Sequence, residues 1–205
     1  MFTFYVSAKT VPSRSGITGG IEAKPNALPW VVELFKNQKP SCGGTIICPR
    51  FVITAAHCVQ MRPEYPQIHP QDMKIVAGVH DWSKAEPTQS HHKVKAFHVH
   101  PEWMYTGVDL ALIELADPIK MRPEARAAFL PDGSESFQSV PRFIASGWGR
   151  RNLTDGGSKV LRSVTIPWVP DVKCHKAYPQ TKDVICAGDF ETGAIGGCKG
   201  DSGSK

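Results

Sequence analysis

Short apolar runs separated by turn residues recur along the chain from Trp30 onward. Nine of these runs have the length of a β-strand, and each is bounded by Pro, Gly, Asn or Asp. They are Trp30–Phe35, Gly43–Ile47, Phe51–Thr54, Lys74–Ala77, Val94–Val99, Leu110–Leu115, Arg142–Ser146, Val160–Ile166 and Val184–Ala187. Only Asp171–Tyr178, which follows Pro170, has the flanking residues typical of a helix. Evenly spaced strands favour an all-β barrel or sandwich over an alternating βαβ fold.

Two stretches of the chain lack this strand pattern. Residues 1–16 are polar in their second half, and their apolar start, Met1–Val6, is too short for the core of a signal peptide. We therefore expect 1–16 to be an exposed leader or activation segment whose N-terminus is incomplete or misassigned. Met121–Ser139 is rich in Pro, Gly, Ser and charge, which predicts a connection between two β halves.

The composition is that of a globular protein. Of 205 residues, 41% are apolar and 21% are charged, with 18 Gly and 17 Pro, which argues against disorder, collagen and coiled coil. The net charge of +5 comes without a clustered basic run, so we expect no nucleic acid partner. The best apolar run, Leu110–Ala116, is interrupted by Glu114 and is far shorter than the roughly 18 residues of a membrane span.

Six cysteines point to an oxidising compartment. Cys42 and Cys58 are sixteen residues apart and Cys174 and Cys186 are twelve apart, so each pair could close a modest loop. No Cys-x-x-Cys or Cys/His zinc spacing occurs. Asn152 begins the one glycosylation sequon, Asn-Leu-Thr, which agrees with a secreted protein but adds little weight.

Three segments carry the residue types of nucleophilic catalysis: Thr54-Ala-Ala-His57-Cys58, Asp109-Leu-Ala-Leu-Ile113 and Gly200-Asp-Ser202-Gly203. Taken singly, each has an ordinary explanation as a core histidine, the start of a strand or a turn. Together, in the order His, Asp, Ser, they resemble the chymotrypsin-like (trypsin-type) serine proteases. The resemblance runs from about Ile17 to Lys205. It includes Ile17-Thr-Gly-Gly20, Cys42-Gly-Gly-Thr45, Gly147-Trp-Gly149 and Cys186-Ala-Gly188.

The resemblance implies an all-β fold of two six-stranded-type antiparallel β-barrels packed together. The protease domain would span 17–205, with a first barrel over about 17–120 and a second over about 121–205. Catalysis would occur at the seam, and the Cys42–Cys58 pair matches the family's bridge around the catalytic histidine. The implied protein is secreted or stored in a secretory granule, needs no cofactor or metal, and acts on proteins or peptides. An activating protease and protein inhibitors would be its further partners.

The implied catalytic residues are His57, Asp109 and Ser202, and each role makes chemical sense. Serine is too weak an acid to attack an amide unaided, so Ser202 needs His57 as a base. The carboxylate of Asp109 would hold the imidazole in the correct tautomer and stabilise its positive charge. The backbone N–H groups of Gly200 and Ser202 would form the oxyanion hole.

The resemblance also implies an activation pair, Ile17 and Asp201. In the family, cleavage frees an N-terminal ammonium that pairs with this buried aspartate. Here Gly16 precedes Ile17, and Arg14 lies three residues upstream of it, so a cut after Arg14 would leave the amine two residues too far along. Two-residue trimming or an activator that accepts glycine would solve this. Without either, the protein remains a zymogen, because Asp201 would not gain the ammonium.

Two positions near the end of the chain bear on specificity and activity. Gly196 stands at the family's pocket floor, where an enzyme specific for Lys or Arg would have an aspartate, so cleavage after apolar or small residues is expected. The chain ends Gly203-Ser204-Lys205, whereas the family continues through Pro-Leu, further strands and a helix. Cys198 would lack its partner there. We therefore expect a fragment or truncated product with an incomplete second barrel and little activity.

Two functions remain open at this point. An intact triad favours a secreted serine endopeptidase, whereas the truncation and the unusual activation site favour a non-catalytic, protease-like binding or regulatory protein.

Three other features leave their function undecided. Cys48 is either a free thiol or a tether to another chain or domain. His91, His92, His98 and His100 form a dense cluster, but strand alternation alone is too weak a reason to propose a metal site. Asp81 and Glu86 are spaced unsuitably for the family's calcium loop, so no calcium site is expected either.

Overall fold

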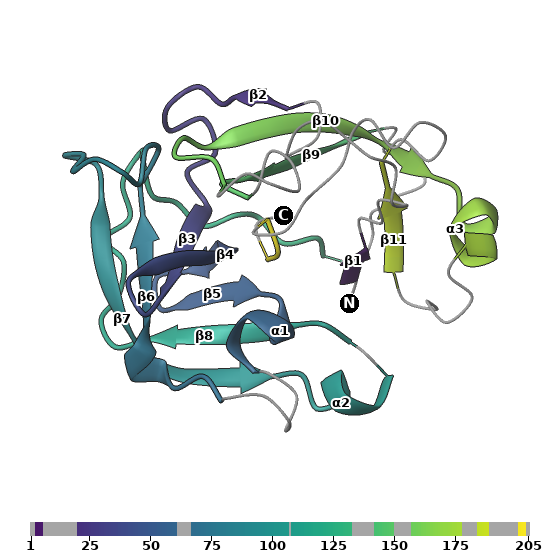
Figure 1. Ribbon diagram of the computed structural model, residues 1–205, viewed down its shortest axis with the longest axis horizontal. Coiled ribbons are helices and arrows are strands. Elements are labelled where there is room, and N and C mark those ends of the chain that lie inside the picture. Colours follow the sequence, from purple (N-terminus) through teal and green to yellow (C-terminus); the bar gives the residue numbers. More distant parts are fainter. Residues whose placement is uncertain are drawn as a thin grey trace.

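The computed structural model describes residues 3–5, 20–60, 67–106, 108–132, 142–149, 157–177, 184–188 and 201–203. Two β structures face each other in it: a barrel formed by the first half of the chain and a curved sheet formed mainly by the second half (Figure 1). Residues 201–203 lie between the two (Figure 1). The all-β, chymotrypsin-like fold that the sequence predicts is therefore confirmed.

Six antiparallel strands close the barrel in the order β3-β4-β5-β8-β7-β6. Their bounds are β3 Val31–Lys36, β4 Lys39–Cys48, β5 Phe51–Thr54, β6 Met73–Ala77, β7 Ser90–Val99 and β8 Ala111–Leu115. A 3₁₀ turn, η1 Pro70–Asp72, precedes β6, and α2 Trp103–Thr106 lies between β7 and β8. Closure matters for the site because it fixes the ends of β4, β5 and β8 relative to one another.

The barrel interior is filled by alternate residues of its strands. On β8 the side chains of Ala111, Ile113 and Leu115 are buried, and the two between them are partly exposed. Burying an Ile or Leu side chain in this way contributes roughly 1.5–3 kcal/mol. The barrel is thus a rigid support for groups at its rim.

The second structure is a five-stranded sheet in the order β1-β11-β10-β2, with β9 also paired to β10. Its strands are β1 Thr3–Tyr5, β2 Ile21–Glu22, β9 Arg142–Gly147, β10 Arg162–Val169 and β11 Val184–Ala187. Helix α3, Asp171–Ala177, follows β10 and is joined to β11 by the Cys174–Cys186 disulfide. Over the described residues this sheet does not close into a second barrel.

An apolar cluster joins the barrel to the sheet. Its buried members are Ala23, Val31, Val76, Val79, Trp148 and Leu161. The loop after β6 adds backbone bonds across the junction, since Leu161 N donates to His80 O at 2.9 Å and Trp82 N donates to Lys159 O at 3.0 Å. We call this junction the interface.

All nine strands predicted from the apolar runs are present, with ends that differ by a few residues, and the predicted helix is α3. The elements that the pattern did not predict are short: β1, β2, the 3₁₀ turn η1, α2 and the one-turn helix α1, Ala56–Val59. Segments of two to four residues are too short to show a periodicity. β1 lies within the segment 1–16, where no strand was expected, and its residues Thr3–Tyr5 pair in parallel with β11.

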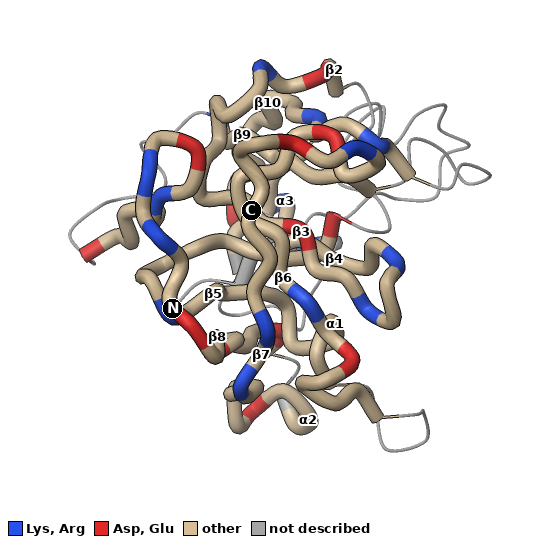
Figure 2. The backbone as a smooth tube through the Cα atoms, turned by 90° about the vertical axis from the view of Figure 1, so that its left-hand side faces the viewer, with Lys and Arg blue, Asp and Glu red and all other residues tan. Residues whose placement is uncertain are grey.

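Charges of both signs are interspersed along the described chain (Figure 2). Within the described part, no helix is both long and apolar enough to cross a bilayer.

Candidate active site

His57 lies on α1, which begins two residues after β5 ends. The other side chains of this single turn, Ala56, Cys58 and Val59, are buried, so the turn has one exposed position. Cys58 is bonded to Cys42 of β4, with the two Cα atoms 6.2 Å apart. The helix is therefore fastened to the barrel on its buried side and presents the imidazole on the other.

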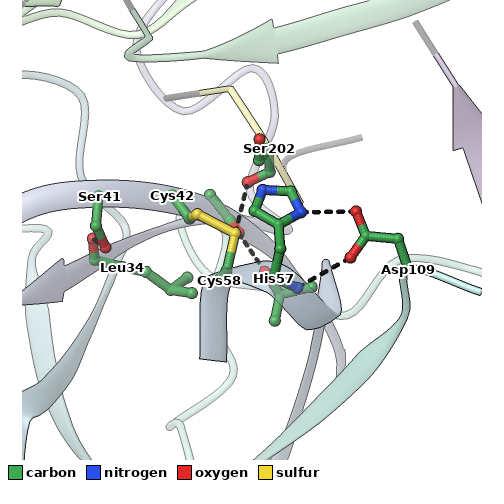
Figure 3. The surroundings of a disulfide bond; sticks show 9 residues. Leu34, Ser41, Cys42, His57, Cys58, Asp109 and Ser202 are labelled. Carbon is green, nitrogen blue, oxygen red and sulfur yellow. Dashed lines mark hydrogen bonds and ion pairs between the residues drawn. A yellow bond between two sulfur atoms is a disulfide. The ribbon is translucent and has the colours of Figure 1, made fainter. Parts of the chain in front are cut away.

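Asp109 contacts His57 through both of its carboxylate oxygens. Oδ2 lies 2.6 Å from the ring Nδ1, and Oδ1 accepts a hydrogen bond from the His57 backbone N–H at 2.9 Å (Figure 3). Asp109 precedes β8, whose pairing with β5 brings it beside α1. With Nδ1 donating to the carboxylate, Nε2 of a neutral ring is left as the basic atom.

Ser202 is held beside His57 by its backbone. Gly43 N–H of β4 donates to the Ser202 carbonyl at 2.8 Å, and the Cys58 sulfur contacts the same oxygen at 3.8 Å. The sulfur belongs to a disulfide and carries no hydrogen, so this second contact is van der Waals only. Figure 3 shows the imidazole of His57 with Asp109 on one side and Ser202 on the other. The structure thus brings together the three predicted catalytic residues.

Gly203 allows this close approach. Its φ is +84°, which disfavours side chains, and a Cβ there would collide with Thr54 Oγ1 and with the Gly43 carbonyl oxygen. Those two atoms are themselves joined by a hydrogen bond of 2.8 Å. The last glycine of the Gly-Asp-Ser-Gly motif is therefore required for residues 201–203 to pack on the barrel.

Asp201 lies in the interface and is only 3% exposed. Its Oδ1 accepts a hydrogen bond from Gly149 N–H at 2.8 Å. A Cβ on Gly149 would lie 2.5 Å from the carboxylate carbon, closer than non-bonded atoms tolerate. The Asp201 side chain therefore packs against the Gly147-Trp-Gly149 motif, at Gly149.

Several predicted site residues lie outside the described residues. They are Ile17, Asn152, Gly196, Cys198 and Gly200. Both predicted cysteine pairs are disulfides in the structure, and Cys48 is the free cysteine of the described part.

Ligand atoms of Cys42, His57 and Cys58 lie close enough together to suggest a metal site. Both sulfurs belong to the disulfide, however, so neither is available as a thiolate ligand.

Two histidines of the cluster on β7 contact other side chains. His98 Nε2 lies 3.0 Å from Glu114, and His92 Nε2 lies 2.9 Å from the hydroxyl of a neighbouring serine.

The loop after β6 uses its carboxylates internally. Glu86 accepts hydrogen bonds from the backbone N–H groups of His80 and Asp81, at 2.7 and 3.1 Å. Asp81 accepts from Ser83 Oγ at 2.6 Å and pairs with Lys84 at 2.9 Å. The Ser83 and Lys84 hydrogen bonds lower the pKa of Asp81 to about 2. The two acids therefore organise this loop.

Sequence reasoning missed Gly43 and Glu33. Gly43 acts through its backbone, for which the sequence offers no signal beyond the family landmark. Glu33 could have been noticed as a charged residue inside the apolar run Val31–Leu34.

Known proteins resemble this chain over nearly its whole length. A family model described as Trypsin matches residues 17–204. Ovochymase-2 of Mus musculus is 33% identical over 199 residues, which cover 92% of this chain and 32% of that protein. Mannan-binding lectin serine protease 1 of Homo sapiens is 32% identical over 203 residues, covering 91% of this chain and 28% of that protein. The chain thus spans about a third of the length of the relatives it matches.

Proposed function

Because the chain belongs to the trypsin family of serine proteases, we propose that it hydrolyses peptide bonds with Ser202, His57 and Asp109 as the catalytic triad. The observation that carries the proposal is the double contact of Asp109 with His57, 2.6 Å to the ring and 2.9 Å to the backbone. The two contacts hold the imidazole ring and also the first turn of the helix that carries it. The contact fixes where the basic nitrogen points, which is what general-base catalysis requires.

The reaction proceeds in two halves. His57 Nε2 removes the proton of Ser202 Oγ as that oxygen attacks the peptide carbonyl, and the imidazolium then protonates the leaving amine. Water repeats the sequence on the acyl-enzyme, with His57 again as base. Asp109 remains ionised throughout and stabilises the imidazolium. Because the rigid barrel holds His57 and Asp109, their relative positions stay the same in both halves of the reaction. The same two groups can therefore serve in acylation and in deacylation.

We assign the oxyanion hole to the backbone N–H groups of Gly200 and Ser202, and the activation pair to Ile17 and Asp201. The position of Asp201 supports the second assignment, since a carboxylate that is 3% exposed is stabilised by a nearby positive charge. The hydrogen bond from the neutral Gly149 amide compensates for burial less than an ammonium would.

For the substrate we propose proteins or peptides cleaved after apolar or small residues, since Gly196 would leave the pocket floor uncharged. The two disulfides favour an extracellular or secretory compartment. An activating protease and protein inhibitors follow as partners from the same proposal.

A covalent serine probe tests the triad. The protein beginning at Ile17, with any natural sequence that follows Lys205 included, should be labelled by an apolar fluorophosphonate, with the label on Ser202, and Ser202→Ala should abolish labelling. Asp109→Asn should reduce the turnover of an apolar peptide by about 10⁴-fold, the loss known for this substitution in the chymotrypsin triad. Asp117→Asn, at an exposed position after β8, is the matched control and should leave turnover unchanged.

Labelling of another residue, or equal labelling of the Ser202→Ala variant, would contradict the proposal. If the same extended protein beginning at Ile17 is folded but neither labelled nor active, it is instead a protease-like binding protein.

A further inference from the structure

Glu33 is a buried carboxyl in the interface. It lies in β3, where Val32 and Leu34 belong to the barrel interior and Val31 belongs to the interface cluster with Trp148. Side chains of a strand alternate between its faces, so Glu33 lies on the same face as Val31. Its exposure is only 2%.

The strands beside Glu33 provide no counter-charge. Its partners in register are Gly43 on β4 and Val76 on β6, both uncharged. His91 on β7 continues this row but is exposed to solvent, and Lys74 on β6 places its ammonium over an aromatic ring, 5.1 Å from the centroid. Among the described residues, Glu33 Oε2 has no hydrogen-bond partner. A carboxyl in these surroundings is more stable with its proton than without.

The Asp201 carboxylate acts on Glu33 from the other side of the interface, and its negative charge disfavours ionisation of Glu33. Gly43, opposite Glu33 in register, is the residue whose N–H holds the Ser202 carbonyl at 2.8 Å, so residues 201–203 are seated on the strand next to Glu33. Asp201 begins this segment and is itself 3% exposed. Burial raises the pKa of Glu33 well above its ordinary value of 4.5, and the charge of Asp201 raises it further.

We propose that Glu33 and Asp201 form a proton-linked carboxyl pair, in which Glu33 is a positioning residue for the segment that carries Ser202. Glu33 holds a proton while Asp201 is ionised, and loss of this proton weakens the seating of residues 201–203 on β4. The proposal rests on the proposed function only in that this segment contains the nucleophile.

Because of this pair, the packing of residues 201–203 on β4 should weaken as the pH rises. The stability contribution of protonated Glu33 is fully present below pH 4.5 and is lost as the pH rises through the raised pKa. Above that pKa, and before an Ile17 ammonium pairs with Asp201, two negative charges share one buried interface and their repulsion is poorly screened there. A neutral residue of the same shape at position 33 would remove this dependence.

Infrared spectroscopy of the full chain tests the protonation directly. A protonated carboxylic acid has its own carbonyl stretch, and we expect such a band near neutral pH that is missing in Glu33→Gln. The control is Glu114→Gln, because the hydrogen bonds from Lys95 and His98 lower the pKa of Glu114, so this variant should keep the band. In Asp201→Asn the band should disappear at a lower pH than in the wild type, because the repelling charge is gone. A band that survives in Glu33→Gln, or that is lost at the same pH in Asp201→Asn, would overturn the pair.

Hydrogen exchange tests the seating without requiring activity. The protection factor of the Gly43 amide, corrected for the intrinsic pH dependence of exchange, should fall as Glu33 deprotonates and should stay constant in Glu33→Gln. Equal pH dependence in both proteins would refute a positioning role. Fluorophosphonate labelling of the protein beginning at Ile17 adds the functional readout, since a rise in pH should lower its labelling more than that of the same protein with Glu33→Gln. If no protein is labelled, the proposed function fails, while the infrared and exchange results still decide this proposal.

Discussion

Among individual residues, those without a side chain matter to the site as much as those that carry its chemistry. Gly203 lets the backbone of residues 201–203 touch β4, and Gly149 leaves room for the Asp201 carboxylate. In both places the volume of one methyl group is already occupied by a polar group of the neighbouring segment. Such glycines are therefore part of the site although they carry no reactive group.

Gly149→Ala should displace Asp201. The new Cβ would lie 2.5 Å from the carboxylate carbon, and Asp201 is too buried to move without disturbing its neighbours. We expect a loss of about 1–3 kcal/mol in the free energy of unfolding, as is usual for overpacking. Chemical denaturation of the wild type, Gly149→Ala, Asp201→Ala and the double variant measures the coupling. Equal costs of Gly149→Ala with and without the Asp201 side chain would show that the clash lies elsewhere.

Asp81 should contribute stability that disappears in acid. Its pKa is lowered from 3.8 to about 2, mainly by the Ser83 hydroxyl and by Lys84, so the contribution is present above pH 3.8 and lost as the pH falls through 2. The difference in unfolding free energy between the wild type and Asp81→Asn should therefore shrink between pH 4 and pH 2. Ser83→Ala, which removes one donor, should reproduce part of the effect. A difference that does not change with pH would mean that Asp81 acts only through packing.

Among the elements, two short helices are each fastened by a disulfide, with different consequences for the site. Cys42–Cys58 joins β4 to α1, which carries His57, whereas Cys174–Cys186 joins α3 to β11. A helix as short as α1 is not stable by itself in water, because the conformational entropy lost in forming the first turn exceeds the free energy gained from its hydrogen bonds. The position of His57 is thus set by the disulfide, by its carboxylate partner and by the packing of α1 on the barrel.

Removing the two disulfides separately should separate activity from stability. The Cys42→Ser, Cys58→Ser pair should lose about 3 kcal/mol of stability and most of the fluorophosphonate labelling, because α1 is released from β4. The Cys174→Ser, Cys186→Ser pair should lose a similar amount of stability but keep its labelling rate. Thermal unfolding and labelling below the unfolding transition measure both quantities. Equal loss of labelling in the two pairs would show that α1 has no special dependence on its bridge.

In the molecule as a whole, the proposed triad depends on the barrel and the second sheet remaining in contact. The interface combines apolar packing with hydrogen bonds, two of them to the His80 carbonyl, which accepts from Trp148 Nε1 and from Leu161 N, each at 2.9 Å. Trp148 is 3% exposed and directly precedes Gly149, whose N–H binds the Asp201 carboxylate. Loosening this contact should therefore affect Asp201 as well as stability.

Trp148→Phe should destabilise the molecule, by about 1–3 kcal/mol, through the lost hydrogen bond and the cavity left by the smaller ring. Trp103→Phe is the matched control, because Trp103 Nε1 is buried without a partner among the described residues. Because Trp103→Phe shrinks the ring but removes no hydrogen bond, it should cost less stability than Trp148→Phe. Denaturant unfolding of both variants checks the contrast, and an equal loss in the two proteins would refute it.

Local patterns along the chain were sufficient to predict the strands and the family. The nine apolar runs became strands because the burial of alternate side chains is a local pattern, and the family follows from motifs whose order can be read along the chain. The roles of His57, Asp109 and Ser202 remain a proposal, although the structure places the three residues together.

Contacts between distant residues could be known only from the folded molecule. The double contact of Asp109 with His57 joins residues 52 positions apart, and the bond between Gly149 and Asp201 joins residues equally distant. The relation between Glu33 and Asp201 requires that the interface exist at all. Burial and proximity of this kind depend on how the barrel and the sheet pack, and no local pattern of residues encodes that.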